Sequence, residues 1–380
     1  MKRVGGLWPQ LSSFANLLAA AEAAAAGKRD RPDVATFLME LEPNLLRLRR
    51  ELLDGSYRPG AYRTFVILEP KRREISAAPF RDRVVHHALT RVLEPVFEKR
   101  FSPHSFACRK GKGAHAALRL ASGAAKEHPY VLKCDIRKYF ASIDHEILNA
   151  KLARVVKCAP TLALAATIIA GSNPQEECAF YFDGEDLFTA MERRRGLPLG
   201  NQTSQFFANV YLDGLDQFVT RHLRPWAYAR YVDDFVVFGE DKGELRRMRA
   251  SLADFLQAER LLLHEGKSRT FRCGDGVTFL GWRVFPTHLR LVRGNVVRCS
   301  RRLRWLAAAY REGRVSWDTI ALSVRAWIGH AGFGDTVGLR WRLLGRIAFQ
   351  TPSGIRPNGT AGRFFPQQYE EPALGLSQQQ

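Results

Sequence analysis

Helical periodicity marks several long segments of this chain. From 81 to 97 the apolar residues fall three and four positions apart, as on one face of an amphipathic helix: Val84, Val85, Ala88, Leu89, Val92 and Leu93. Helices are also predicted over 11–26, 41–53, 146–170, 205–223 and 243–262. Asp54-Gly55 supplies a stop signal directly after the second of these.

Short apolar runs bounded by turn residues predict the strands. Residues 62–68 and 74–76 form a predicted hairpin with Lys71, Arg72 and Arg73 at its tip. Other strands are predicted over 130–135, 228–238 (strand–turn–strand) and 278–284, and a short hairpin near 180–188 lies within a polar, irregular stretch of about 171–195. This mixture of helices and hairpins is typical of an α+β fold.

The composition adds a strong positive charge. The 380 residues include 58 Lys+Arg against 38 Asp+Glu, a formal net charge of +20, and 46% are hydrophobic. Such a chain folds around a core, so its charge indicates a polyanionic partner, most often nucleic acid; the alternative is that it serves solubility alone. No run of about 18 apolar residues predicts a membrane span. The six scattered cysteines favour free thiols in a reducing cytoplasm.

Half of the net charge lies in residues 281–346, which contain 13 arginines and three acidic residues. Aromatic residues interleave with these arginines: Trp282, Trp305, Tyr310, Trp317, Trp327 and Trp341. Arginine beside aromatic rings suits backbone neutralisation and base stacking on nucleic acid. The alternative is that the tryptophans form the core of a helical bundle. Residues 349–380, rich in Pro, Gly and Gln, predict a poorly ordered tail.

Candidate chemistry centres on carboxylates in an apolar setting. Asp233 and Asp234 lie in a predicted tight turn, where two adjacent anions repel each other and are partly desolvated. A divalent cation relieves this cost, and oxygen ligands favour Mg²⁺ or Mn²⁺. The strand 130–135 also ends on a carboxylate, and pairing beside the turn brings Asp135 and Asp233 together to hold two metals. Without that pairing, Asp-Asp is an ordinary hairpin turn.

Tyr231-Val232-Asp233-Asp234 resembles the Tyr-x-Asp-Asp signature of reverse transcriptases. The order of further segments is similar to the prokaryotic group of group II intron, retron and diversity-generating retroelement enzymes. These segments are 69–75, 80–89, 101–113, 135–140, Lys267 and 279–282. The resemblance implies a right-hand polymerase fold with fingers, a palm of antiparallel sheet packed on helices, and a helical thumb.

The implied domains follow the order of these segments. We expect an N-terminal helical extension (1–60), fingers (61–134), a palm with the irregular insertion (135–285), a basic helical thumb (286–348) and the tail (349–380).

The resemblance also assigns roles to individual residues. Catalysis and metal binding fall on Asp135, Asp233 and Asp234, with the backbone carbonyl of Ile136 as a further ligand and two Mg²⁺ ions as cofactor. The implied nucleotide contacts are Lys71 and Arg73 on the triphosphate, Phe140 or alternatively Tyr139 against a ribose 2′-hydroxyl, Leu199 and Gly200 beneath the base pair, Gln205 and Lys267. Arg109, Lys110 and the Gly281-Trp282 turn are the implied primer and template contacts.

The segment 196–205 bears on the subtype. Leu199-Gly200 followed by Ser204-Gln205 is similar to diversity-generating retroelement enzymes, whereas group II intron and retron enzymes carry Pro-Gln-Gly there. That subtype implies error-prone copying of a template RNA into cDNA, from dNTPs and a DNA primer strand, with errors at adenines and with an accessory RNA-binding protein. We expect a cytoplasmic protein that is bacterial or phage-encoded. The open alternatives are a defence-linked or group II intron-like reverse transcriptase and a non-polymerising RNA-binding scaffold.

Overall fold

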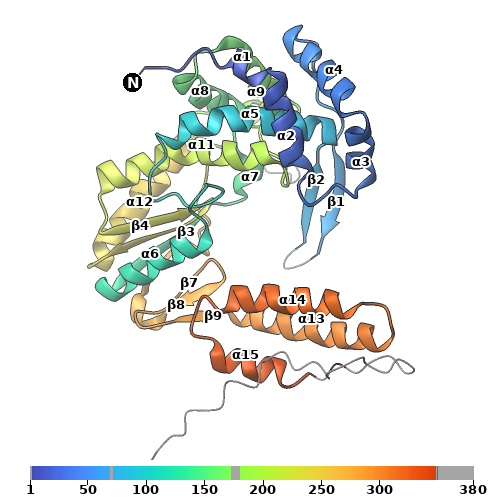
Figure 1. The fold of residues 1–380 in the computed structure, drawn as a ribbon. Helices are drawn as coiled ribbons and strands as arrows, with labels where there is room; N and C mark the ends of the chain where they lie inside the picture. The colour runs from blue at the N-terminus through green and yellow to red at the C-terminus, as the bar shows by residue number, and fades with distance from the viewer. Residues whose placement is uncertain (1, 69–71, 173–179, 348, 350–380) are drawn as a thin grey trace, which may run out of the picture. The chain divides into compact units, whose positions relative to one another are not determined.

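The computed structural model describes residues 2–68, 72–172, 180–347 and 349, without the side chain of Leu187. The chain divides into two compact units, whose elements are labelled in Figure 1. Unit 1 comprises Met1–Leu280 and Val284–Pro286, and unit 2 comprises Gly281–Arg283 and Thr287–Gln380. The predicted tail, apart from residue 349, lies outside the described residues.

Unit 1 begins with helices α1 (Trp8–Leu11), α2 (Phe14–Ala25), α3 (Pro32–Met39) and α4 (Leu41–Leu53). The helix predicted over 11–26 is confirmed for 14–25 but begins three residues later, because Ser13 caps α2 by accepting a hydrogen bond from the Asn16 amide. Helix α2 lies along α5 (Phe80–Glu98), whose apolar face matches the predicted periodicity (Figure 1). The N-terminal helices therefore share the large core of unit 1.

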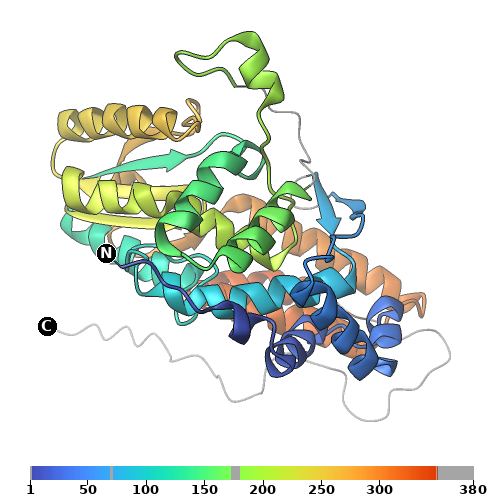
Figure 2. The ribbon, with the colours of Figure 1, turned by 90° about the horizontal axis from the view of Figure 1, so that it is seen from above.

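The remaining helices of unit 1 follow α5 along the chain. They are α6 (Ala114–Glu127), α7 (Tyr139–Ser142), α8 (His145–Val155), α9 (Ala159–Ala170), α10 (Leu187–Glu192), α11 (Gln202–Phe218), a π-helical turn (Val219–Leu223), α12 (Lys242–Ala258) and a 3₁₀ turn (Cys273–Asp275). The hairpin predicted near 180–188 is wrong, because Asp186 caps α10 through the Thr189 amide. Figure 2 shows the α10 segment projecting from the rest of unit 1.

The central sheet of unit 1 has the strand order β4-β5-β3-β6, with every neighbouring pair antiparallel. Its strands are β3 (Tyr130–Asp135), β4 (Ala227–Tyr231), β5 (Asp234–Gly239) and β6 (Arg269–Arg272). Helix α12 packs against β3 and β5, and α6 packs against β4 and β5. The predicted antiparallel sheet packed on helices is confirmed, although the expected boundary at 134/135 falls inside β3.

A separate hairpin joins β1 (Arg63–Ile67) to β2 (Arg73–Ala77) in the register Arg63↔Ala77 to Ile67↔Arg73. This agrees with the predicted hairpin. All five residues of β1 are exposed, so side-chain burial does little to stabilise that strand. The tip residue Lys71 lies outside the described residues.

Three short strands, β7 (Val277–Phe279), β8 (Trp282–Val284) and β9 (Leu289–Leu291), lie where the chain passes between the units. The single strand predicted over 278–284 is interrupted, because Leu280 and Gly281 form a turn with φ values of +48° and +82°.

In the part of unit 2 that the structure describes, the chain continues with helices α13 (Arg293–Arg311), α14 (Trp317–Ala331) and α15 (Val337–Leu344). Its core includes Leu303, Leu306, Ile320 and Val324, with Trp317 and Trp327 packed against it. Trp305 and Trp341 remain exposed, so they lie outside this core, and base stacking by them stays a prediction. Within the described residues, no helix is both long and apolar enough to cross a membrane.

Candidate functional site

The β4–β5 turn and the end of β3 gather the predicted carboxylates. Asp234 opens β5 and is the direct cross-strand partner of Asp135, the last residue of β3. Asp233 precedes Asp234 in the turn, and its carbonyl oxygen accepts a hydrogen bond from the Ile136 amide at 3.2 Å. Antiparallel pairing thus places Asp135, Asp233 and Asp234 at one end of the sheet, as the sequence predicts.

Lys267, which precedes β6, supplies a cation to this end of the sheet. Its Nζ lies 3.0 Å from Oδ1 of Asp135, and its side chain is 53% exposed. The loop is fastened by the His264 amide, which donates to the Asp135 carbonyl at 2.7 Å. Lys267 therefore lies at the carboxylates, where its charge offsets that of Asp135.

The pKa values of two of these carboxylates are raised above the ordinary value. Burial raises the pKa of Asp233, and the charge of Asp135 raises it further, while Lys267 and Arg73 act in the opposite direction. Burial raises the pKa of Asp234 to about 7, although the nearby Lys133 lowers it. Both carboxylates are thus costly to keep ionised without more positive charge.

Whether these residues could bind a metal ion depends on which of their oxygen atoms lie close together. Among the described residues, no group of three or more His, Cys, Asp and Glu side chains is arranged to hold a metal ion. Asp234 has a buried Oδ1 that accepts no hydrogen bond, with the Lys133 ammonium 3.5 Å away. The charges of Asp135 and Asp233 act on each other and both act on Asp234, so carboxylate oxygens suited to a divalent ion gather here. The exposed ammonium of Lys267 lies beside them.

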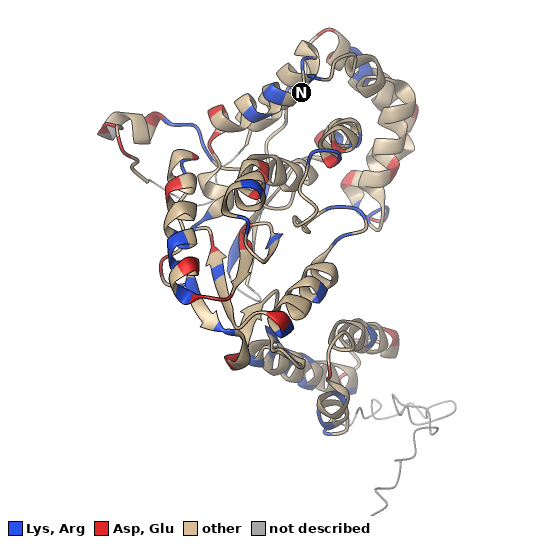
Figure 3. Cartoon of the chain, turned by 90° about the vertical axis from the view of Figure 1, so that its left-hand side faces the viewer, with Lys and Arg blue, Asp and Glu red and all other residues tan. Residues whose placement is uncertain are grey.

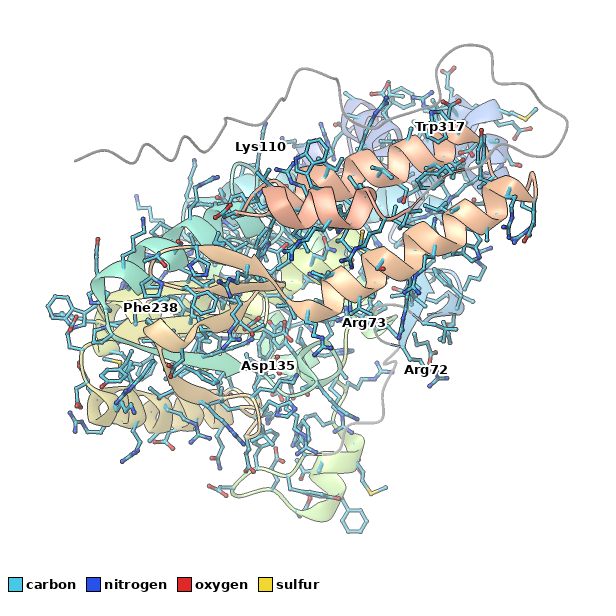
Figure 4. The ribbon with its side chains drawn as sticks, turned by 90° about the horizontal axis from the view of Figure 1, so that it is seen from below. Arg72, Arg73, Lys110, Asp135, Phe238 and Trp317 are labelled. Carbon is cyan, nitrogen blue, oxygen red and sulfur yellow. The ribbon has the colours of Figure 1, made fainter. Side chains whose placement is uncertain are left out.

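The side of the site facing the hairpin carries Arg73, the first residue of β2. Arg73 is exposed, and its charge reaches Asp233. Figure 4 labels Arg73 and Asp135. The Ser76 amide donates to the Leu199 carbonyl at 3.1 Å, which fastens the Leu199-Gly200 segment to β2. A Cβ on Gly200 would lie 2.9 Å from Cγ2 of Ile75 at φ +114°, so only glycine allows this close approach.

Of the two residues predicted to exclude a ribose 2′-hydroxyl, Tyr139 is buried and Phe140 is accessible. Tyr139 is 2% exposed, and its hydroxyl donates to the Ala208 carbonyl at 2.6 Å. Its side chain is therefore excluded from direct contact with a nucleotide. Phe140 is half-buried and remains available for that role. Gln205, on the first turn of α11, is exposed.

The two basic residues predicted as primer or template contacts differ in their surroundings. The Arg109 side chain is 5% exposed, binds Glu98 and donates to the carbonyls of Ser102 and Ser105. Its guanidinium holds the 102–109 loop together, which excludes it from contact with nucleic acid. Lys110 is exposed and keeps the predicted role available.

Gly281 and Trp282 belong to unit 2. Trp282 is completely buried, with its ring centroid 5.6 Å from that of His330 and 5.9 Å from that of Phe333. Gly281 accepts a hydrogen bond on its carbonyl from Nδ2 of Asn295. Any contact with a primer at this turn therefore comes from the backbone rather than from the indole.

Sequence reasoning missed the residues that support the turn. Lys133 neutralises Asp234 from the neighbouring strand, and a buried ion pair joins Arg230 to Asp216. The available signal was charge in an apolar strand, since Arg230 interrupts Tyr228-Ala229 and Tyr231-Val232, and a buried arginine requires an anionic partner.

Comparisons with known proteins agree with this geometry. The family model described as "Reverse transcriptase (RNA-dependent DNA polymerase)" matches residues 68–284. Protein YkfC of Escherichia coli (strain K12) is 26% identical over 291 residues, covering 66% of this chain and 73% of that protein. Group II intron-encoded protein LtrA of Lactococcus lactis subsp. cremoris is 25% identical over 181 residues (47% and 28%), and the Retron Mx65 reverse transcriptase of Myxococcus xanthus is 28% identical over 159 residues (41% and 36%). The matches thus span under half of the last two relatives.

Proposed function

The chain belongs to the reverse transcriptase family of RNA-dependent DNA polymerases, whose model covers more than half of it, and we propose that it copies a template RNA into cDNA from dNTPs. The observation that carries this proposal is the convergence of Asp135, Asp233 and Asp234 at one end of the sheet. In the right-hand description, unit 1 supplies the fingers and palm, and the helices of unit 2 supply the thumb.

The roles of the residues follow from their surroundings. Enzymes of this family generally use divalent metals, and Mg²⁺ held by Asp135, Asp233 and the Ile136 carbonyl would supply activation of a primer hydroxyl and neutralise a triphosphate. Asp234 opens β5 beside Lys133 and supports the turn. Lys267 neutralises Asp135 in this structure. Its ammonium would be free to bind the triphosphate or the primer once a divalent ion neutralised Asp135 instead.

The nucleotide contacts complete the proposal. Arg73, together with Lys71, binds the triphosphate, because a guanidinium can bind phosphate oxygens in a bidentate way. Phe140 rejects a ribose 2′-hydroxyl by its bulk. Leu199 and Gly200 lie beneath the new base pair, Gln205 contacts nucleotide or template, and Lys110 contacts the template.

The finer proposal is that this enzyme belongs to a diversity-generating retroelement, acts with an accessory RNA-binding protein and works in the cytoplasm. Leu199-Gly200 and Ser204-Gln205 support it. The similarity to a group II intron-encoded protein and a retron enzyme supports a group II intron-like alternative.

Primer extension on a defined RNA template tests both the proposed polymerase activity and the proposed retroelement subtype. We expect incorporation of dNTPs that requires the RNA, with substitutions in the cDNA concentrated opposite template adenines. Sequencing the product of wild type and of a Leu199→Ala, Gln205→Ala variant measures the error spectrum. Faithful copying at adenines would favour the group II intron-like alternative, and no incorporation would overturn the proposed activity.

The arginines of α13 should give duplex binding a strong dependence on salt. Figure 3 shows that basic residues occur throughout the described chain, and Arg301, Arg304 and Arg311 are exposed along α13. Replacing these three with glutamine is expected to reduce the slope of log K against log salt by about one for each phosphate that is no longer neutralised. Filter binding of a primer–template duplex at several salt concentrations measures it. Arg246→Gln with Arg247→Gln on α12 is the control, and an equal slope change per residue in both variants would contradict a special role for α13.

A further inference from the structure

The turn between β4 and β5 contains a strained residue. Val232 has φ of +58°, in the left-handed region that a β-branched side chain adopts only at a cost. Asp233 follows directly, so the direction of its carboxylate depends on this conformation. A turn of this kind persists only where surrounding contacts determine it.

Arg230 makes such a contact from the opposite face of the sheet. Arg230 pairs with Phe235, whereas Asp135 pairs with Asp234, the next residue toward the turn, so successive side chains place Arg230 and Asp234 on different faces. One Nη1–H of Arg230 donates to the Val232 carbonyl at 2.9 Å. The guanidinium thus lies beneath the turn and binds the backbone of its strained residue.

The other four donors of Arg230 are also satisfied. Nε and Nη2 donate to the two oxygens of Asp216 at 2.7 and 2.5 Å, Nη2 donates to Ser105 at 3.0 Å, and Nη1 donates to Asn209 at 3.4 Å. Arg230 and Asp216 are both completely buried. With all five N–H groups engaged, the guanidinium has one orientation, and the Val232 contact is fixed with it.

Asp216 anchors this network to α11. Its Oδ1 also accepts from the Tyr228 hydroxyl at 2.8 Å. The backbone of Arg230 is held as well, because its amide donates to the His104 carbonyl and its carbonyl accepts from the Phe106 amide, each at 2.9 Å. A helix, a strand and the 104–106 segment therefore converge on one guanidinium.

We infer that Arg230 is a positioning residue for the polymerisation proposed above. Braced by Asp216, it holds Val232 in the left-handed conformation that directs the Asp233 carboxylate toward Asp135. The inference rests on the proposed function, because it assigns Arg230 to the geometry of that reaction rather than to folding alone.

Lysine cannot reproduce this arrangement, because a single ammonium cannot bind both Asp216 oxygens and reach the Val232 carbonyl. We expect Arg230→Lys to keep the buried ion pair but lower kcat about 30-fold, with KM for dNTP changed less than about twofold. The half-saturating Mg²⁺ concentration should rise, and the increase in melting temperature caused by Mg²⁺ should shrink.

A second substitution tests the role of the turn itself. Val232→Gly removes the steric cost of a positive φ, so adding it to Arg230→Lys should recover about tenfold of the lost kcat. Arg193→Lys is the matched control, because the Arg193 side chain is also largely buried and paired with Asp144 but does not bind the turn. We expect the control to polymerise like wild type.

The outcomes separate positioning from folding. If Arg230→Lys fails to fold, the double variant Arg230→Met, Asp216→Leu removes the buried charges together, and it should fold yet keep a low kcat that Val232→Gly improves. Wild-type kcat and Mg²⁺ response in the folded Arg230 variant, or no recovery with Val232→Gly, would overturn the inference. Lack of incorporation by wild type would instead overturn the proposed function.

Discussion

Asp233→Asn is expected to abolish RNA-templated DNA synthesis, with kcat falling by at least about 10³-fold, or about 4 kcal/mol of transition-state stabilisation. The substitution keeps the size of the side chain but removes the anion that faces Asp135 at the end of β3. An amide oxygen is a poorer ligand for Mg²⁺ than a carboxylate. Single-turnover primer extension on an RNA template measures the loss.

The same variant should be more stable than wild type without divalent cations. Burial raises the pKa of Asp233 in the folded protein, so the folded state binds its proton more tightly than the unfolded state does. Stability from this group is therefore lost as the pH rises above the ordinary carboxyl range, and a neutral amide avoids that loss. The melting temperature in EDTA at pH 8 measures the gain.

Asp213→Asn is the matched control for both effects. Asp213 lies on α11, and burial raises its pKa as well, but it is not at the strand ends. Its amide variant should share the gain in stability and retain polymerase activity. Equal incorporation by wild type and Asp233→Asn would contradict the catalytic assignment, as would an equal loss in Asp213→Asn.

The sequence predicts those parts of the site whose residues are close together along the chain. Strand β3 ends on Asp135 and β5 begins with Asp234, so the apolar runs predict that both carboxylates lie at strand ends, whereas their catalytic role follows from the family resemblance. The hairpin containing Asp233 follows from the same reasoning. The four-stranded order does not, because β6 is a short edge strand, Arg269–Arg272, with little apolar pattern.

Side-chain partners distant in sequence were also beyond reach. Arg109 looks like a nucleic-acid contact until Glu98 and two carbonyls are seen to occupy its guanidinium. The Arg230–Asp216 pair joins a strand to a helix, and the sequence around either residue does not identify the other as its partner. Charge in a sequence shows that a partner exists, whereas the fold decides whether that partner is a ligand or another residue.

Trp282→Ala is expected to destabilise unit 2 by about 3–5 kcal/mol, the usual cost of removing a large aromatic side chain from a core. Trp282 is completely buried against His330 and Phe333. A Cβ on Gly334 would lie only 2.3 Å from Cζ3 of its ring, so the backbone of unit 2 is fitted closely to the indole. Urea unfolding and hydrogen exchange of the α14 amides measure the effect.

Trp305→Ala provides the control, because Trp305 has the same side chain in the same unit but is 46% exposed. We expect a cost below about 1 kcal/mol for it, since little apolar surface returns to water. The comparison distinguishes two roles for Trp282. If Trp282 is a core residue, the Trp282→Ala protein is less stable than wild type. Its KM for primer, measured at a low temperature at which the variant stays folded, then changes little. A rise in primer KM without loss of stability would instead mean that the indole touches the primer, in contradiction to its burial.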